Sequence, residues 1–324
     1  EMFALKEVAV TVSYSQLTKG QKIEKHLEEK PKPKDFSEYR IMGSSFHRVD
    51  GVAKVTGEAK YAGDFRMPGM VYAKILRPPS HGAKLESADT SGAGSIAGIQ
   101  VVRDGDLIAV LHEDPEKAEA ALVKIKADYT FNEMDVNDKS VFKRMLAIKS
   151  DPRIVESKGE VAAGKKLAVT FFDHEFHNSY VAHAPMEPHT ALAWMEGDKV
   201  IARVGTQSPF GAQDAVARAL ELPLDRVRII TPFIGGGFGG KAPAGQAVEA
   251  ARLAKITGKP VMVQWSRQEE FFYDTFRPAA VIKITSGIDP EGKIRMWDYH
   301  EYFAGSRGSD TIYDVSDRCT TSYS

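Results

Sequence analysis

Five of the six residues from 235 to 240 are glycine, and Phe238 alone interrupts them. The preceding residues, Val227–Ile234, alternate branched and basic side chains and then turn apolar, which is typical of a buried strand. The following segment, Ala247–Lys255, has apolar residues at helical spacing, and Gly258 with the next Lys-Pro ends it. We therefore expect the glycines between a strand and a helix, where backbone N–H groups can point at an anion.

Two nucleotide-binding motifs fit this loop in part. The pattern G-x-G-x-x-G begins at Gly235, and the pattern G-x-x-x-x-G-K ends at Lys241. The second lacks the Ser or Thr that holds Mg²⁺, because Ala242 follows the lysine. The first lacks its acidic residue, since Ser and Arg follow the strand-like run Pro260–Trp265. An ATP site, a dinucleotide site and a plain packing turn all stay open on the loop alone.

The composition excludes several classes of protein. Basic and acidic residues nearly cancel, at 43 and 44, which argues against a nucleic-acid surface. No apolar stretch is long enough to span a bilayer. The one cysteine, Cys319, excludes a disulfide framework, a four-cysteine zinc site and an iron–sulfur cluster held within this chain. The compartment stays open.

The order of predicted elements indicates an α+β protein in three parts. Residues 1–40 read as an N-terminal tail and a charged, proline-punctuated linker, with a short strand at Val8–Tyr14. Residues 41–150 read as a small α+β domain, and residues 151–324 as a second domain after a polar, lysine-rich excursion. The other expected strands are Leu107–Leu111, Val123–Tyr129, Leu167–His174, Thr190–Met195, Lys199–Val204, Val261–Trp265, Ala280–Ser286 and Ile294–Phe303, and the other helices are Glu116–Ala121, capped by Asp114, and Gly211–Leu220.

Several motifs occur together in one order. They are HAPMEPHTALA at 183–193, VGTQSPFGAQDAVARALELPLDRVRIITPFIGGGFGGK at 204–241 and GKPVMVQWSRQEEF at 258–271. In this order and spacing they resemble the molybdenum-binding subunit of the xanthine dehydrogenase and aldehyde oxidase family. The segment 54–129 is similar to that family's hammerhead domain. The N-terminal part, with VSYSQL at 12–17 and the segment 34–57, is most similar to the isoquinoline 1-oxidoreductase and nicotinate dehydrogenase branch.

The resemblance implies a cofactor and partners. Members hold molybdenum on a molybdopterin cofactor, in some cases a dinucleotide, and insert water-derived oxygen into a C–H bond. Two electrons then pass to iron–sulfur clusters and to a flavin or haem, which we expect on partners only. The implied partners are the remaining half of the molybdenum subunit, an iron–sulfur subunit and a small-molecule substrate. Neither nucleic acid nor a membrane span is expected.

The resemblance also assigns cofactor-binding residues in this sequence. Gln207 is the glutamine whose amide can hydrogen-bond an oxygen on the metal, and the backbone N–H groups of Phe238 and Gly239 would face the metal's oxo group. Such donors act as an oxyanion hole does. Gly237 and Gly240 flank Phe238 so that a bulky cofactor can approach the main chain. The resemblance thus implies that Gln207 and Phe238 lie near the molybdenum, although neither is a thiolate ligand.

Each assignment has a simpler structural alternative. Gln207 could be a solvated polar residue at a strand end, and Phe238 could pack between sheet and helix. We expect Glu187, His189 and His183 to form a hydrogen-bonded structural turn. Lys241 is disfavoured at a helix start unless an anion, such as the pterin phosphate or a carboxylate, lies beside it.

A second charged group comes after the strand expected at Val261–Trp265. We expect Arg267, Glu269 and Glu270 to form a solvated charged face.

The sequence also departs from the family's pattern. Ala242 replaces the glutamate that grips purine substrates, which argues against xanthine. Nothing here resembles the segments that supply the family's catalytic glutamate and its substrate-binding arginine, so we place no catalytic residue in this chain. We expect a fragment, or one subunit of a split enzyme.

These observations favour part of a molybdenum hydroxylase that acts on an N-heteroaromatic compound or an aldehyde. The alternatives are a non-catalytic interaction module of such a complex, which does not itself bind the cofactor, and a nucleotide-binding enzyme.

Overall fold

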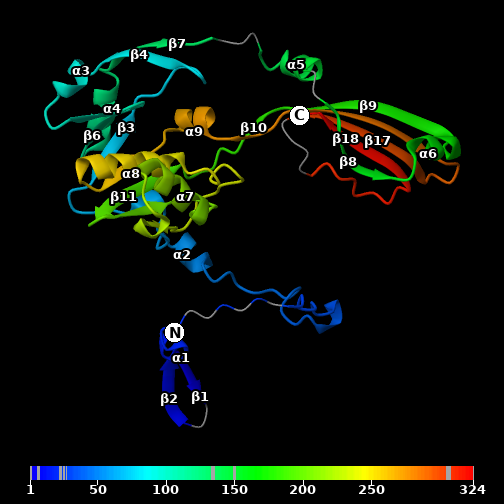
Figure 1. The fold of residues 1–324 in the computed structure, drawn as a ribbon, viewed down its shortest axis with the longest axis horizontal. Coiled ribbons are helices and arrows are strands. Elements are labelled where there is room, and N and C mark those ends of the chain that lie inside the picture. Colours follow the sequence, from blue (N-terminus) through cyan, green and yellow to red (C-terminus); the bar gives the residue numbers. More distant parts are fainter. Residues whose placement is uncertain are drawn as a thin grey trace. The chain divides into compact units, whose positions relative to one another are not determined.

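The computed structural model describes residues 2–5, 8–21, 24, 26, 28–132, 136–148, 151–303 and 308–323. The chain forms two compact units, Glu1–Val55 and Thr56–Ser324 (Figure 1). In the described part of the chain, no helix has the length and apolar character needed to cross a membrane.

The first unit contains a small hairpin and short helices. Strands β1 (Met2–Leu5) and β2 (Val8–Ser13) pair antiparallel, so the strand expected over Val8–Tyr14 is confirmed. Helix α1 (Tyr14–Thr18) begins directly after β2, because Ser13 and Gln16 form a reciprocal capping box. Two further turns of helix follow, η1 (Phe36–Glu38) and α2 (Gly51–Val55).

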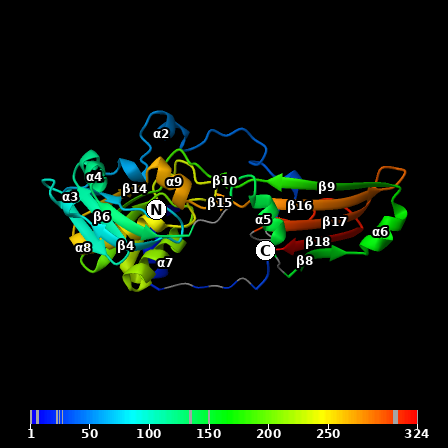
Figure 2. The ribbon, with the colours of Figure 1, turned by 90° about the horizontal axis from the view of Figure 1, so that it is seen from above.

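A mixed seven-stranded sheet organises the second unit (Figures 1 and 2). Its strands, in spatial order, are β13 (Val227–Ile230), β12 (Lys199–Val204), β11 (Thr190–Glu196), β14 (Val261–Gln264), β3 (Val71–Ile75), β6 (Leu107–His112) and β5 (Gln100–Asp104). The pairs β13–β12 and β14–β3 are parallel, and the others are antiparallel.

This sheet runs across the predicted boundary at residue 150. Val71 of β3 lies beside Val261 of β14, so strands from the 41–150 segment continue a sheet built by the later segment. The mixed α and β architecture agrees with the predicted class. The hammerhead assignment and the three-part division of the chain remain proposals.

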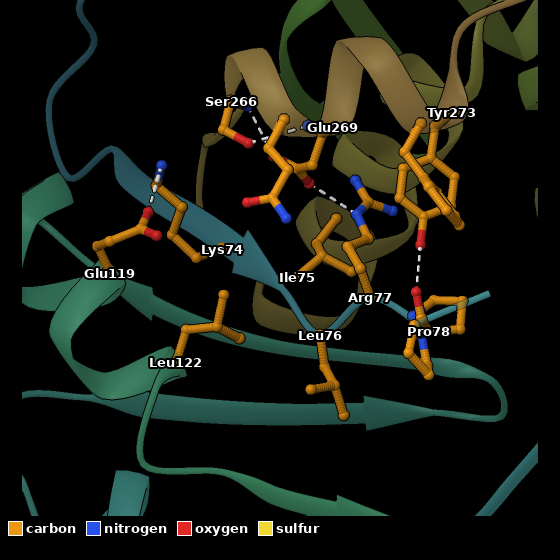
Figure 3. A pocket seen from close by; sticks show the side chains of 13 residues that line it. Lys74, Ile75, Leu76, Arg77, Pro78, Glu119, Leu122, Ser266, Glu269 and Tyr273 are labelled. Atoms are coloured by element: carbon orange, nitrogen blue, oxygen red, sulfur yellow. Dashed lines mark hydrogen bonds and ion pairs between the residues drawn. The ribbon is translucent and has the colours of Figure 1, made fainter. Parts of the chain in front are cut away.

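Arg77, just after β3, connects this strand to two helices, and Figure 3 shows its contact with Glu269 in one of them. Its guanidinium pairs with Glu249 of α8 (Gly245–Thr257) and, at 2.7 Å, with Glu269 of α9 (Arg267–Tyr273). The hydroxyl of Tyr273 donates to the carbonyl of Pro78 at 3.3 Å. These contacts fix the position of α9 relative to the end of β3.

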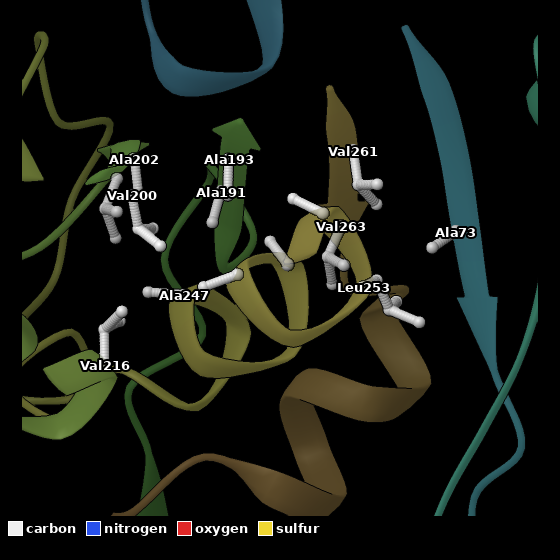
Figure 4. Close-up of a cluster of buried hydrophobic side chains, with 14 of the residues drawn as sticks. Ala73, Ala191, Ala193, Val200, Ala202, Val216, Ala247, Leu253, Val261 and Val263 are labelled. Carbon is white, nitrogen blue, oxygen red and sulfur yellow. The ribbon is translucent and has the colours of Figure 1, made fainter. Parts of the chain in front are cut away.

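The core lies between the sheet and helices α8 and α7 (Pro209–Leu220), as Figure 4 shows for α8. Alanines of α8 let the helix lie close to β11, β12 and β14, and alternate residues of those strands complete the cluster. The other face buries Leu192 and Met262 at one end, and Val110 against α4 (Pro115–Leu122) at the other.

A two-stranded ribbon is formed by the strands that precede α3 (Ser91–Gly94) and follow α4 in the sequence. Strand β4 (Lys84–Asp89) pairs with β7 (Lys126–Thr130), and α3 contacts α4. The strand predicted from Val123 begins at Lys126 instead, because the N–H groups of Val123 and Lys124 still bond to carbonyls of α4. The last turn of α4 therefore extends into the residues for which the sequence predicted a strand.

A second sheet of five strands is built from residues after 150. In order its strands are β8 (Arg153–Lys158), β18 (Asp317–Tyr323), β17 (Ile294–Phe303), β16 (Ala280–Ile288) and β9 (Thr170–Asn178). Helices α5 (Val141–Ala147) and α6 (Val161–Leu167) contact this sheet. The strand predicted from Leu167 starts only at Thr170, because α6 includes Leu167.

A ribbon of β10 (Val181–Ala182) and β15 (Phe276–Arg277) lies next to β9 and β16 in the sequence. Two short 3₁₀ turns, η2 (Ala62–Asp64) and η3 (Leu224–Arg226), complete the elements.

Candidate functional site

The glycine loop is separated from both flanking elements. Strand β13 ends at Ile230, four residues earlier than predicted, since Pro232 follows and cannot donate to a strand ladder. Helix α8 begins only at Gly245, after the intervening residues 241–244. In the nucleotide motifs the glycines lead directly into the helix whose N-terminus faces the phosphates. The structure therefore argues against both nucleotide alternatives.

Two glycines are required because side chains pack directly on the loop. A Cβ on Gly237 would lie 2.5 Å from Oε1 of Gln207, and one on Gly240 would lie 2.3 Å from Oδ2 of Asp274. Real Cβ atoms do not approach oxygen so closely, so any side chain here would displace Gln207 or Asp274. Gly237 and Gly240 are both buried, so in this structure they serve close packing of Gln207 and Asp274 against the loop.

Phe238 points outward from the loop. Its side chain is 74% exposed, so the alternative in which Phe238 packs between sheet and helix is wrong. Its φ of 55° lies in the left-handed region, which costs a non-glycine residue about 1 kcal/mol or more. A turn holds it there, with the Gly240 N–H donating to the Gly237 carbonyl at 2.9 Å. An exposed aromatic ring on a strained turn is typical of a ligand-contacting position.

Gln207 lies beside this turn, between β12 and α7. Its amide oxygen accepts the N–H of Gly239 at 2.9 Å, and its own backbone N–H donates to the Lys241 carbonyl at 2.9 Å. The Gly239 N–H is therefore not free in this structure, which differs from the expectation that it faces a ligand. Because the oxygen is engaged, the amide nitrogen of Gln207 is the group left to donate away from the loop.

A buried ion pair supports the back of the loop. Nζ of Lys241 lies 2.6 Å from Oε2 of Glu187, and the Lys241 side chain is completely buried. The same carboxylate accepts the N–H groups of Gly235 at 2.8 Å and of Ala62 at 3.3 Å. Lys241 thus has the anionic neighbour that the sequence required, and it is a carboxylate of the protein. The structural turn expected at Glu187 is confirmed.

A second buried pair lies next to it. Both ring nitrogens of His189 face oxygen atoms, Nδ1 at 2.9 Å from Oε1 of Glu270 and Nε2 at 3.0 Å from the Gly240 carbonyl. The backbone N–H of His189 also donates to Glu270, and the ring stacks on Trp265. His189 therefore has the structural role predicted for it, because it connects the end of the loop to α9.

Glu270 does not belong to a solvated face. It is only 2% exposed, so the prediction for this residue is wrong. Burial alone would raise the pKa of its carboxyl, but the hydrogen bonds from the side chain and backbone of His189 outweigh it and lower the pKa below the ordinary glutamate value.

The other two residues of the predicted charged face also have partners. Arg267 donates to the carbonyls of Pro185 at 2.8 Å and Met186 at 3.3 Å. Glu269 pairs with Arg77 and accepts the N–H of Ser266 at 2.6 Å, which caps α9. The sequence did contain the signal for this helix, since Ser266 and Glu269 have the S-x-x-E spacing of a capping box. Arg267, Glu269 and Glu270 therefore hold the 183–189 segment and β3 against α9.

An open hollow of about 520 Å³ lies on the exposed side of the loop. The ribbon of β10 and β15 forms one wall, and Phe238 and Gly239 form the other. Its polar lining consists of His183, Thr275 and Arg277. A separate pocket of about 340 Å³ lies at the exit of β3 (Figure 3), but none of the glycine-loop residues lines it. The hollow beside Phe238 is therefore the candidate site.

With this geometry in place, comparison with known proteins assigns the class. The sequence profile of the molybdopterin cofactor-binding domain matches residues 148–323, which is more than half of the chain. The chain belongs to this family.

The relatives are named as subunits of dehydrogenases and oxidoreductases. The chain is 27% identical over 317 residues to a nicotinate dehydrogenase polypeptide of Pseudomonas putida, covering 93% of this chain and 26% of that protein. It is 29% identical to the beta chain of isoquinoline 1-oxidoreductase of Brevundimonas diminuta over 268 residues, covering 79% of this chain and 34% of that protein. The predicted resemblance is confirmed.

A solved structure supports the fold. The aldehyde oxidoreductase of Desulfovibrio desulfuricans superposes with a TM-score of 0.74 at 20% identity, covering 88% of this chain and 39% of that one. The likeness extends to the fold alone at this identity. The chain therefore spans about a quarter to two fifths of the length of these three proteins.

Proposed function

We propose that this chain is part of a molybdenum hydroxylase that inserts water-derived oxygen into a C–H bond of an N-heteroaromatic compound or an aldehyde. The observation that carries the proposal is the exposed, strained Phe238–Gly239 turn within the family match. The names of the relatives support the substrate class, since nicotinate and isoquinoline are N-heteroaromatic compounds.

The residues at the loop fit a bulky, electron-rich cofactor. Gly239 is exposed and leaves the main chain open on the side of the hollow, which the exposed Phe238 also lines, whereas Gly237 and Gly240 are buried behind them. Gln207 is exposed beside the loop, and its amide nitrogen is the group left to donate, because the Gly239 N–H engages the amide oxygen. Gln207 with Gly237, Phe238, Gly239 and Gly240 would hold the cofactor through hydrogen bonds and close contact.

The chain's own residues position the donors. When bound, the molybdenum cofactor supplies oxygen transfer and accepts two electrons from the substrate. Gln207 would donate to an oxygen atom that gathers charge during the reaction, and a donor that is already oriented stabilises such charge without reorganisation. The pairs Glu187–Lys241 and His189–Glu270 hold the loop rigid behind it. Iron–sulfur and flavin or haem centres on partner subunits would take the electrons onward.

The decisive experiment is a metal and cofactor analysis of the complete native assembly. We expect molybdenum and pterin in a ratio near one to one per molybdenum subunit. An assembly that contains neither would favour the alternative of a non-catalytic interaction module. A rise in melting temperature with millimolar ATP or NAD would instead favour the alternative of a nucleotide-binding enzyme.

A further inference from the structure

His183 is held by a buried carboxylate at the edge of the hollow. Its Nδ1 lies 3.2 Å from Oδ2 of Asp274, whose side chain is 3% exposed. Oδ1 of Asp274 accepts the N–H of Thr275 at 2.7 Å, so the carboxylate is fixed from two sides. Because a carboxylate only accepts, Nδ1 of His183 carries the proton in this contact.

The second ring nitrogen of His183 reaches the surface of the loop. Nε2 lies 3.1 Å from the position that a Cβ on Gly239 would occupy. Since Nδ1 is engaged by Asp274, Nε2 is the nitrogen left for a ligand, and it accepts a hydrogen bond in the neutral ring or donates one in the charged ring. The His183 ring therefore has a fixed orientation toward the hollow. A histidine that served only the structural turn would not need this orientation.

The lining of the hollow is cationic. Arg277 of β15 is exposed and lines it, and the described lining residues include neither Asp nor Glu. Asp274 is not among the lining residues, and its carboxylate accepts from His183 and from the N–H of Thr275. A guanidinium in such a place suits a phosphate or carboxylate, which it can bind with two parallel hydrogen bonds.

We propose that the hollow is an anion-binding subsite of the glycine-loop site, in which Arg277 and Nε2 of His183 contact a phosphate or carboxylate and Asp274 holds the His183 ring. The proposal deepens the proposed function, on which it rests for the source of the anion. A phosphate would belong to the pterin cofactor, whereas a carboxylate would belong to the substrate.

The first test uses inorganic phosphate and the full-length assembly prepared without cofactor. Titration calorimetry should show that Arg277→Gln weakens phosphate binding about tenfold or more, as expected when a charged hydrogen-bond donor is lost. Arg228→Gln is the matched control, because Arg228 is exposed on β13 and does not line the hollow. Equal phosphate binding by wild type and Arg277→Gln, or none by wild type, would overturn the proposal.

Two substitutions of His183 separate its contacts. His183→Asn keeps a donor near the Nδ1 position for Asp274 but removes Nε2, so it should weaken phosphate binding severalfold while the melting temperature stays near wild type. His183→Gln places an amide near the Nε2 position and should retain more of the affinity. The reverse order would contradict the contact through Nε2.

The cofactor-loaded assembly then identifies the source of the anion. A loss of pterin and molybdenum in Arg277→Gln, with normal content in Arg228→Gln, assigns the subsite to the cofactor's phosphate. Normal pterin content with a raised KM for a carboxylated substrate, and an unchanged KM for a neutral one, assigns it to the substrate. Wild-type assembly without molybdenum would reject the proposed function, yet the phosphate titration would still decide the subsite.

Discussion

The two sides of the glycine loop differ in what their residues contact. Behind it, Lys241, His189 and Glu270 are buried, Glu187 is largely buried, and all four are bound to one another or to the backbone. In front, Phe238 is exposed on a turn with positive φ. A loop that needed only to pack would not hold an aromatic ring in solvent at the cost of backbone strain. The difference indicates that the back side determines stability and that the front side serves binding.

The largest effect that tests this comparison is expected from Lys241→Met. The substitution leaves the Glu187 carboxylate in a largely buried position without its cation, which typically costs about 3–5 kcal/mol. Urea unfolding should show this loss of stability. The control Lys259→Met, at an exposed lysine, should stay within about 0.5 kcal/mol of wild type. Similar values for both variants would mean that the back of the loop does not determine stability.

The front side should instead respond in turnover. We predict that Gln207→Ala leaves the free energy of unfolding nearly unchanged but lowers kcat of the assembled enzyme by roughly 10²–10³, the usual effect of removing one donor to a charge-gathering oxygen. Gln268→Ala provides a control, because Gln268 is exposed on α9 and does not line the hollow. Unchanged turnover in Gln207→Ala would remove this residue from the proposed site.

A smaller effect, with a characteristic pH dependence, is expected at Glu270. Its carboxyl has a lowered pKa in the folded protein, so the stability it adds is complete above the ordinary glutamate pKa of about 4.3 and disappears as the pH falls through the lower, folded value. Glu270→Gln removes this charged hydrogen bond and should cost about 1–3 kcal/mol at pH 7.

Unfolding measured from pH 7 to pH 3 checks this expectation. The stability difference between wild type and Glu270→Gln should shrink on the acid side of the titration. A difference that is constant over this range would show that Glu270 contributes through shape alone.

The smallest effect is expected from Phe238→Ala. Because the ring is mostly exposed, its removal should change the free energy of unfolding by no more than about 0.5 kcal/mol. The contrasting variant is Leu253→Ala, at a fully buried leucine of α8, which should cost about 2–5 kcal/mol. A large destabilisation from Phe238→Ala would mean that the front side is also structural.

The sequence by itself determined much of the local structure and the family. Apolar periodicity located β6, β11, β12, β16 and β17, as well as α8, within a few residues of their bounds. The three motifs identified the family by their order and spacing, which can be read from the sequence alone, and the match to the family profile confirms it. The capping box at Ser266 was also present in the sequence, although α9 was interpreted as a charged face.

Only the tertiary structure decided which side chains meet. Lys241 donates to Glu187, Glu270 accepts from His189, and Gln207 accepts the N–H of Gly239. In each pair the two residues come from segments far apart in the chain. Periodicity reports the face of a single element and cannot show which distant element covers it. The physical reason is that charged residues near a glycine loop look alike in sequence whether water or a counter-charge surrounds them. Here the packing of α9 against the 183–189 segment supplies the counter-charge and buries Glu270.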